Sequence, residues 1–137
     1  EEMTRRIREH KLRRGSHWLT VEEPVELCSV LLAQRGRIDA ALIDCVTLWL
    51  SNLMIREDEN SVDQKVRDLL ELLPRLDFHV LFVTNEVGWG IVPDNPLGRS
   101  FRDITGSFNQ RLAAVATEVV LMVTGVPMIV KKAAACS

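Results

Sequence analysis

His10 lies in a setting that suits phosphoryl chemistry. Basic side chains flank it on both sides, among them Arg6, Lys11, Arg13 and Arg14. Cations at these positions attract a phosphate and favour the neutral imidazole, whose free nitrogen lone pair can attack phosphorus. The same pattern also fits an exposed histidine on a charged helix face, and the residues alone leave both interpretations open.

Asp44 is the strongest single candidate that the residue pattern provides. It follows the apolar residues of the run IDAALIDC at 38–45, which reads as a short buried strand. A carboxylate directly after such a strand is where nucleotide-binding α/β proteins hold Mg²⁺. Alternatively, Asp44 caps the helix expected to begin near Thr47.

Glu22 and Glu23 are two further carboxylates that could take part in binding. They follow a short extended stretch at 18–21. Their oxygens could accept hydrogen bonds from sugar hydroxyls, or they could be ordinary surface carboxylates.

Trp89 lies between two glycines in the loop at 87–98, which predicts either a lid over a ligand or an anchor at an interface. The helix after this loop carries five polar side chains of interest: Arg99, Arg102, Asn109, Gln110 and Arg111. Arg99 and Arg102 share one face of that helix, which could contact phosphate, a neighbouring subunit or solvent.

Helices and strands alternate along the chain in a way that would position these residues. Periodicity predicts helices over 1–14, 24–35, 47–56, 61–73 and 99–116, and strands over 38–45, 78–84, 118–124 and 125–130. Ser61 is the expected N-cap of its helix, 57–60 an acidic loop, and 131–137 a loose tail.

Such alternation predicts an α/β fold with parallel strands joined by right-handed crossovers. The strands at 38–45 and 78–84 are so apolar that both faces of the sheet should be covered. Ligands bind beyond the carboxyl ends of parallel strands, so Asp44 and the segment 84–86 should face one crevice.

Composition limits the broad class of the protein. The 137 residues suit one domain, 1–137, and 47% of them are hydrophobic. A net charge of −2 does not favour nucleic acid as a partner, and no apolar run is long enough to span a membrane. We therefore expect a cytoplasmic protein. The three cysteines form no CxxC pair, so no metal motif is predicted.

Several motifs together resemble one known family. They are RIREHKLRR at 6–14 with its flanking residues, ALIDCVTLWLSNLM in the middle of the chain, and then NEVGWGIVP, FRD and NQRLA. On these motifs the chain is similar to the bifunctional adenosylcobinamide kinase / adenosylcobinamide-phosphate guanylyltransferase family of cobalamin biosynthesis. The resemblance covers nearly all of residues 1–130.

The resemblance implies a RecA-like P-loop sheet, a homotrimer and two reactions that use Mg²⁺. One phosphorylates adenosylcobinamide with ATP or GTP, and the other transfers GMP from GTP to adenosylcobinamide phosphate through a guanylylated histidine. The matching histidine is His10, and its neighbour Glu9 occupies a position where some relatives carry a histidine. The positions that match nucleotide contacts are Lys11, Leu12, Arg13, Arg14, Glu22 and Asp44, with Asp44 on the metal side.

One family motif is missing, because no segment of the form GxxxxGK[ST] occurs in these 137 residues. We therefore expect the first strand and the P-loop to be absent from this chain, which places the kinase reaction in question. An alternative is an inactive homologue that acts only in oligomerisation or ligand binding. A third interpretation, a nucleic-acid or phosphate module using the first helix, requires binding that weakens steeply with salt.

Overall fold

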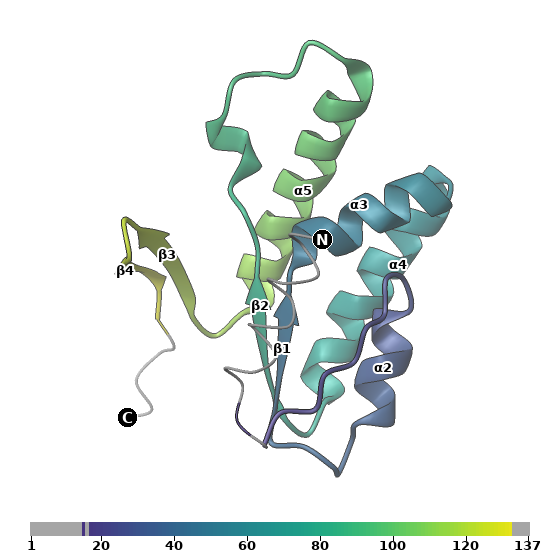
Figure 1. Cartoon of the computed structure of the whole chain (residues 1–137), viewed down its shortest axis with the longest axis vertical. Coiled ribbons are helices and arrows are strands. Elements are labelled where there is room, and N and C mark those ends of the chain that lie inside the picture. The colour runs from purple at the N-terminus through teal and green to yellow at the C-terminus, as the bar shows by residue number, and fades with distance from the viewer. Residues whose placement is uncertain (1–14, 16, 133–137) are drawn as a thin grey trace.

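The computed structural model describes residue 15 and residues 17–132 (Figure 1). The predicted helix over 1–14 and residues 133–137 of the predicted tail lie outside the described residues. Within the described part, the elements in chain order are α2 (Leu27–Ala33), β1 (Ala40–Asp44), α3 (Val46–Arg56), α4 (Glu59–Leu72), η1 (Leu73–Arg75), β2 (His79–Val83), η2 (Val87–Trp89), α5 (Pro96–Val115), β3 (Val119–Val123) and β4 (Val126–Lys131). The predicted α/β class is confirmed.

The central sheet consists of β1 and β2, which pair in parallel with Ala40 opposite His79 and Asp44 opposite Val83. The connection between them contains α3 and α4, as expected for a parallel crossover. Both carboxyl ends therefore lie at the same edge of the sheet.

Only one face of this sheet is covered by the described residues. Ile43 and Phe82 pack against the hydrophobic core, whereas Leu81 and Val83 on the opposite face are 54% and 42% exposed. The prediction that both faces are covered is wrong for the described residues. A run of apolar residues shows that a strand can be buried, but it does not say which elements lie over each face.

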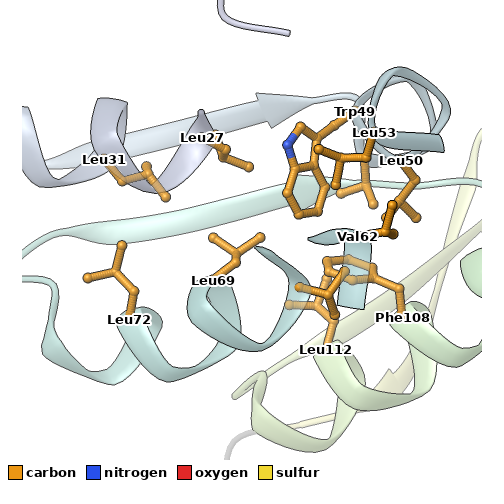
Figure 2. Packing of buried hydrophobic residues seen from close by; sticks show 12 residues of the cluster. Leu27, Leu31, Trp49, Leu50, Leu53, Val62, Leu69, Leu72, Phe108 and Leu112 are labelled. Atoms are coloured by element: carbon orange, nitrogen blue, oxygen red, sulfur yellow. The ribbon is translucent and has the colours of Figure 1, made fainter. Parts of the chain in front are cut away.

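Four helices form the core with the inward face of the sheet. Its fully or nearly fully buried side chains are Leu27, Leu31, Val46, Trp49, Leu50, Leu53, Val62, Val66, Leu69, Leu72, Phe108 and Leu112. The rings of Trp49 and Phe108 pack edge to face with 5.8 Å between their centroids, which joins α3 to α5 (Figure 2). The indole nitrogen of Trp49 donates to the carbonyl of Val25 at 3.0 Å, so this polar atom is satisfied where it is buried.

Helix α4 begins two residues earlier than predicted. Asp58 is its N-cap and accepts a 3.0 Å hydrogen bond from the backbone N–H of Ser61. The prediction of Ser61 as the N-cap is therefore wrong, and part of the expected acidic loop belongs to the first turn of the helix. Asp is as good a cap as Ser, and the sequence offers both within four residues.

Helix α2 is shorter than predicted, because it starts at Leu27 and not at 24. After the helix, Gly36 adopts a φ of 67°, a conformation that favours glycine. Its N–H donates to the carboxylate of Asp77 at 2.9 Å, which links this turn to the segment before β2.

The last two strands form a separate antiparallel hairpin, β3 with β4. The expectation that the third strand would join the parallel sheet is therefore wrong in the described residues. The hairpin turn uses Thr124 and Gly125, both with positive φ, and such turns suit antiparallel neighbours. The sequence pattern predicted the strands but not their partners.

Lys131 belongs to β4 and not to a loose tail. Its ammonium group donates to the carbonyls of Ala113 and Ala114 at 2.9 and 3.0 Å. These carbonyls lie in the last turn of α5, where a cation also complements the helix dipole. The contact fixes the hairpin to the end of α5.

Candidate functional site

Polar residues lie at the carboxyl ends of β1 and β2, and those that follow β2 belong to a hydrogen-bond network. Asp44 ends β1, and Thr84, Asn85 and Glu86 follow directly after β2. Because Asp44 pairs with Val83, these residues lie at one edge of the sheet, as a shared crevice would require.

Asn85 links this edge to the beginning of α3. Its side-chain amide donates a 2.8 Å hydrogen bond to the hydroxyl oxygen of Thr47, which is buried. The same oxygen lies 3.1 Å from the sulfur of Cys45, the residue that precedes α3. The turn after β1 and the turn after β2 are thus held to each other through side chains.

Asn109, in the middle of α5, connects to all three residues that follow β2. Its Oδ1 accepts from the hydroxyl of Thr84 at 2.8 Å. Its Nδ2 donates to the carbonyl of Asn85 and to Oε1 of Glu86, each at 3.2 Å. Both ends of the amide are used, so its orientation is fixed, and Glu86 is held although it is exposed.

Two arginines of α5 fasten the loop that follows Glu86. Arg102 donates to the carbonyl of Gly88 at 2.7 Å, and Arg99 donates to the carbonyls of Pro93 and Asp94 at 3.1 and 2.9 Å. Both arginine side chains are therefore used to hold this loop in place. On this fastened loop, Trp89 and Ile91 are 74% and 97% exposed.

Arg111, the third arginine of this helix, lies elsewhere. Its guanidinium pairs with Asp63 of α4 at 3.3 Å. Both residues line a groove of about 530 Å³ between α3, α4 and α5, away from the strand ends.

Asp44 is exposed, and alternation along β1 places it on the open face of the sheet together with Leu42. The N-cap of α3 is Cys45, and no side chain caps that helix. The alternative interpretation of Asp44 as a helix cap is therefore wrong.

The residues present at this edge suit a metal that is bound partly by substrate. Mg²⁺ is commonly held by one or two carboxylates together with phosphate oxygens and water. Asp44 offers one such carboxylate at the end of β1. Within the described ranges no group of three or more His, Cys, Asp or Glu side chains could hold a metal by itself.

Glu22 and Glu23 differ in what their side chains do. Glu23 accepts from the backbone N–H groups of Val25 and Glu26, both at 2.9 Å, and these bonds hold the pKa of its carboxyl below the ordinary value. It is thus engaged in the turn before α2. Glu22 is exposed and takes part in an interaction elsewhere in the structure.

The remaining predicted site residues lie outside the described residues. They are His10, Lys11, Leu12, Arg13 and Arg14. Sequence reasoning placed Asn109 on the correct helix but grouped it with the arginines and missed its contacts to the strand end. The signal that could have found it is the amide itself, since Asn is a poor helix former in the middle of a helix unless its side chain has a partner.

Comparison with known proteins adds an independent finding. A family model described as cobinamide kinase / cobinamide phosphate guanyltransferase matches residues 1–130. The bifunctional adenosylcobalamin biosynthesis protein CobP of Pseudomonas aeruginosa is 40% identical over 130 residues, which cover 95% of this chain and 75% of that protein. The proteins of the same description called CobU from Salmonella typhimurium and Escherichia coli are 40% and 36% identical over 144 residues, covering 96% of this chain and 80% of each relative.

In the part of the chain that the structure describes, no helix is both long and apolar enough to cross a membrane.

Proposed function

Since the chain belongs to the cobinamide kinase / cobinamide phosphate guanyltransferase family, whose members are kinases and nucleotidyltransferases, we propose that it carries out both reactions on adenosylcobinamide. In the first, a nucleoside triphosphate phosphorylates adenosylcobinamide. In the second, GMP passes from GTP to adenosylcobinamide phosphate. The observation that carries the proposal is the family match over residues 1–130, which includes His10, Asp44 and the network around Asn109.

The proposed guanylyl transfer proceeds in two displacements. The imidazole nitrogen of His10 attacks the α-phosphorus of GTP, a nitrogen–phosphorus bond forms, and pyrophosphate leaves. A phosphate oxygen of the second substrate then attacks the same phosphorus and frees the histidine. Each step exchanges one bond to phosphorus for another, so no further reactant is needed.

The neighbours of His10 have proposed roles in binding GTP. Lys11, Arg13 and Arg14 neutralise phosphate charge as pyrophosphate leaves. Leu12 and Glu22 contact the nucleotide, and a carboxylate such as that of Glu22 can accept hydrogen bonds from ribose hydroxyls.

Asp44 is the proposed ligand of Mg²⁺. When bound, this ion would neutralise charge on the phosphates of the nucleotide. The position of Asp44, exposed at the end of β1 and beside the segment that follows β2, supports this assignment. We further propose that the protein is a homotrimer and works in the cytoplasm, where nucleoside triphosphates are available.

The test is to follow both products with the protein encoded by the complete gene. Adenosylcobinamide with ATP or GTP should yield its phosphate, and adenosylcobinamide phosphate with GTP should yield the GDP-linked product, both resolved by chromatography. Calorimetry with GTP would separate the alternatives. If GTP binds but neither product forms, the inactive homologue is favoured. If the protein binds a polynucleotide and this binding weakens steeply as salt is raised, the nucleic-acid or phosphate module is favoured.

A further inference from the structure

We infer that Glu86 accepts the proton of the substrate hydroxyl in the kinase reaction and that Asn109 is the residue that positions it; this inference rests on the proposed function. Neither the sequence motifs nor the family match assigns a role to this carboxylate, which lies in the hydrogen-bond network at the end of β2.

Glu86 combines exposure with a fixed position. It follows β2 by three residues and is exposed, yet Oε1 is held by Nδ2 of Asn109 at 3.2 Å. The bond from Asn109 uses one acceptor site of Oε1, and each carboxylate oxygen has more than one acceptor site. Glu86 can therefore still accept a hydrogen bond from a substrate hydroxyl.

Asn109 is itself held so that its donor faces Glu86. The Thr84 hydroxyl donates to Oδ1 at 2.8 Å, which assigns the opposite end of the amide to donation. Two turns earlier on α5, Arg102 holds the carbonyl of Gly88 at 2.7 Å. The backbone on the C-terminal side of Glu86 is thereby fastened to the same helix.

The two half-reactions place different demands on a base. An alcohol must lose its proton as it attacks phosphorus, and kinases place a carboxylate to accept that proton. In the kinase step, a bond forms between the substrate oxygen and the γ-phosphorus of the triphosphate. The bond from this phosphorus to the bridging oxygen breaks, the nucleoside diphosphate leaves with the electron pair, and the proton passes to Glu86.

The guanylyl transfer needs no such proton acceptor. Its nucleophiles are an imidazole nitrogen and a phosphate oxygen that is already anionic. A residue that serves as the hydroxyl's base therefore affects one reaction and spares the other, whereas a residue needed only for folding affects both.

The experiment measures each half-reaction separately in the protein encoded by the complete gene. Glu86→Gln should lower kcat of the kinase reaction by about 100-fold or more. With adenosylcobinamide phosphate supplied, the guanylyl transfer of the same variant should keep the wild-type rate. Glu118→Gln, which changes an exposed carboxylate outside the network, is the matched control and should alter neither reaction.

Asn109→Asp tests the positioning role without changing side-chain size. The aspartate still accepts from Thr84 but presents an oxygen, not a donor, to Glu86. Kinase kcat should fall by about 10-fold, with KM for the nucleotide unchanged. Gln110→Glu makes the same amide-to-carboxylate change one residue later on α5 and should leave kcat unchanged.

Four outcomes would count against the inference. Equal loss of both reactions in Glu86→Gln would show a structural role, and an unchanged kinase rate would show no role. Asn109→Asp with wild-type kinase kcat would remove the positioning role. A wild-type protein lacking both reactions would contradict the proposed function itself, and the inference with it.

Discussion

The hydroxyl of Thr84 donates a 2.8 Å hydrogen bond to Oδ1 of Asn109, joining the end of β2 to the middle of α5. This bond is half-buried, and it sets the orientation of the amide that contacts Asn85 and Glu86. The carboxyl edge of the sheet is therefore shaped by a helix that follows it in the chain by more than ten residues.

Replacing Thr84 by Val removes this donor while keeping the branched shape of the side chain. Because Oδ1 of Asn109 is left without its partner in a half-buried site, the free energy of unfolding should fall by about 1 kcal/mol. Urea denaturation measures the change. Thr117→Val, at an exposed threonine, serves as the control, and equal stability of the two variants would contradict the account.

Phe108 connects α5 to α3 through its contact with Trp49, and its side chain is buried. Phe108→Ala should lower the free energy of unfolding by about 3–5 kcal/mol, since it removes buried apolar surface and leaves a cavity. Ile55→Ala, at a side chain of α3 that is 75% exposed, should change it by less than about 0.5 kcal/mol. Similar losses in both variants, measured by urea denaturation, would place the core elsewhere.

Asp58 stabilises α4 in a way that depends on pH. Hydrogen bonds from the backbone N–H and the hydroxyl of Ser61 hold the pKa of its carboxyl below the ordinary value of 3.8. Because the folded-state pKa is lowered, the stabilisation is complete above pH 3.8 and is lost as pH falls through the lowered value.

Asp58→Ala should therefore have a lower melting temperature than the wild type at neutral pH, and the difference should shrink in acid below pH 3.8. Asp58→Asn keeps an oxygen that can cap the helix, so it should retain more stability than the alanine variant. A difference that stays constant across this pH range would contradict the assigned role of the charge.

Lys131 should control how firmly the hairpin is attached to α5. Lys131→Met keeps most of the aliphatic stem but removes the donors to Ala113 and Ala114. Amide hydrogen exchange in β4 should become faster, while exchange in α3 should stay the same. Lys132→Met, at the exposed neighbour, should leave amide exchange in β4 unchanged. Faster exchange of β4 in this control variant would mean that positive charge alone holds the hairpin.

The sequence was sufficient to predict most elements, because their signals are local. The strand 38–45 was found from its apolar run and the helix 47–56 from its apolar sides, and the structure has β1 and α3 at these places. The common edge of Asp44 and residues 84–86 followed from the parallel connection, which the structure confirms.

The features that were missed depend on partners distant in the chain. The apolar residues of β3 did not reveal that this strand pairs with β4 and not with the parallel sheet. Asn109 lies more than twenty residues after the strand end that it contacts, and no local pattern specifies that contact. Two nearby capping residues, Asp58 and Ser61, could be distinguished only by the backbone geometry at the start of α4.

The central proposal is that His10 carries GMP between GTP and its acceptor. The most direct measurement is to incubate the protein encoded by the complete gene with GTP labelled at the α-phosphorus and to count label on the denatured protein. Wild-type protein should be labelled, the label should be lost in acid as expected for a phosphorus–nitrogen bond, and His10→Ala should abolish it while His17→Ala retains it. Persistent labelling of His10→Ala would contradict the account.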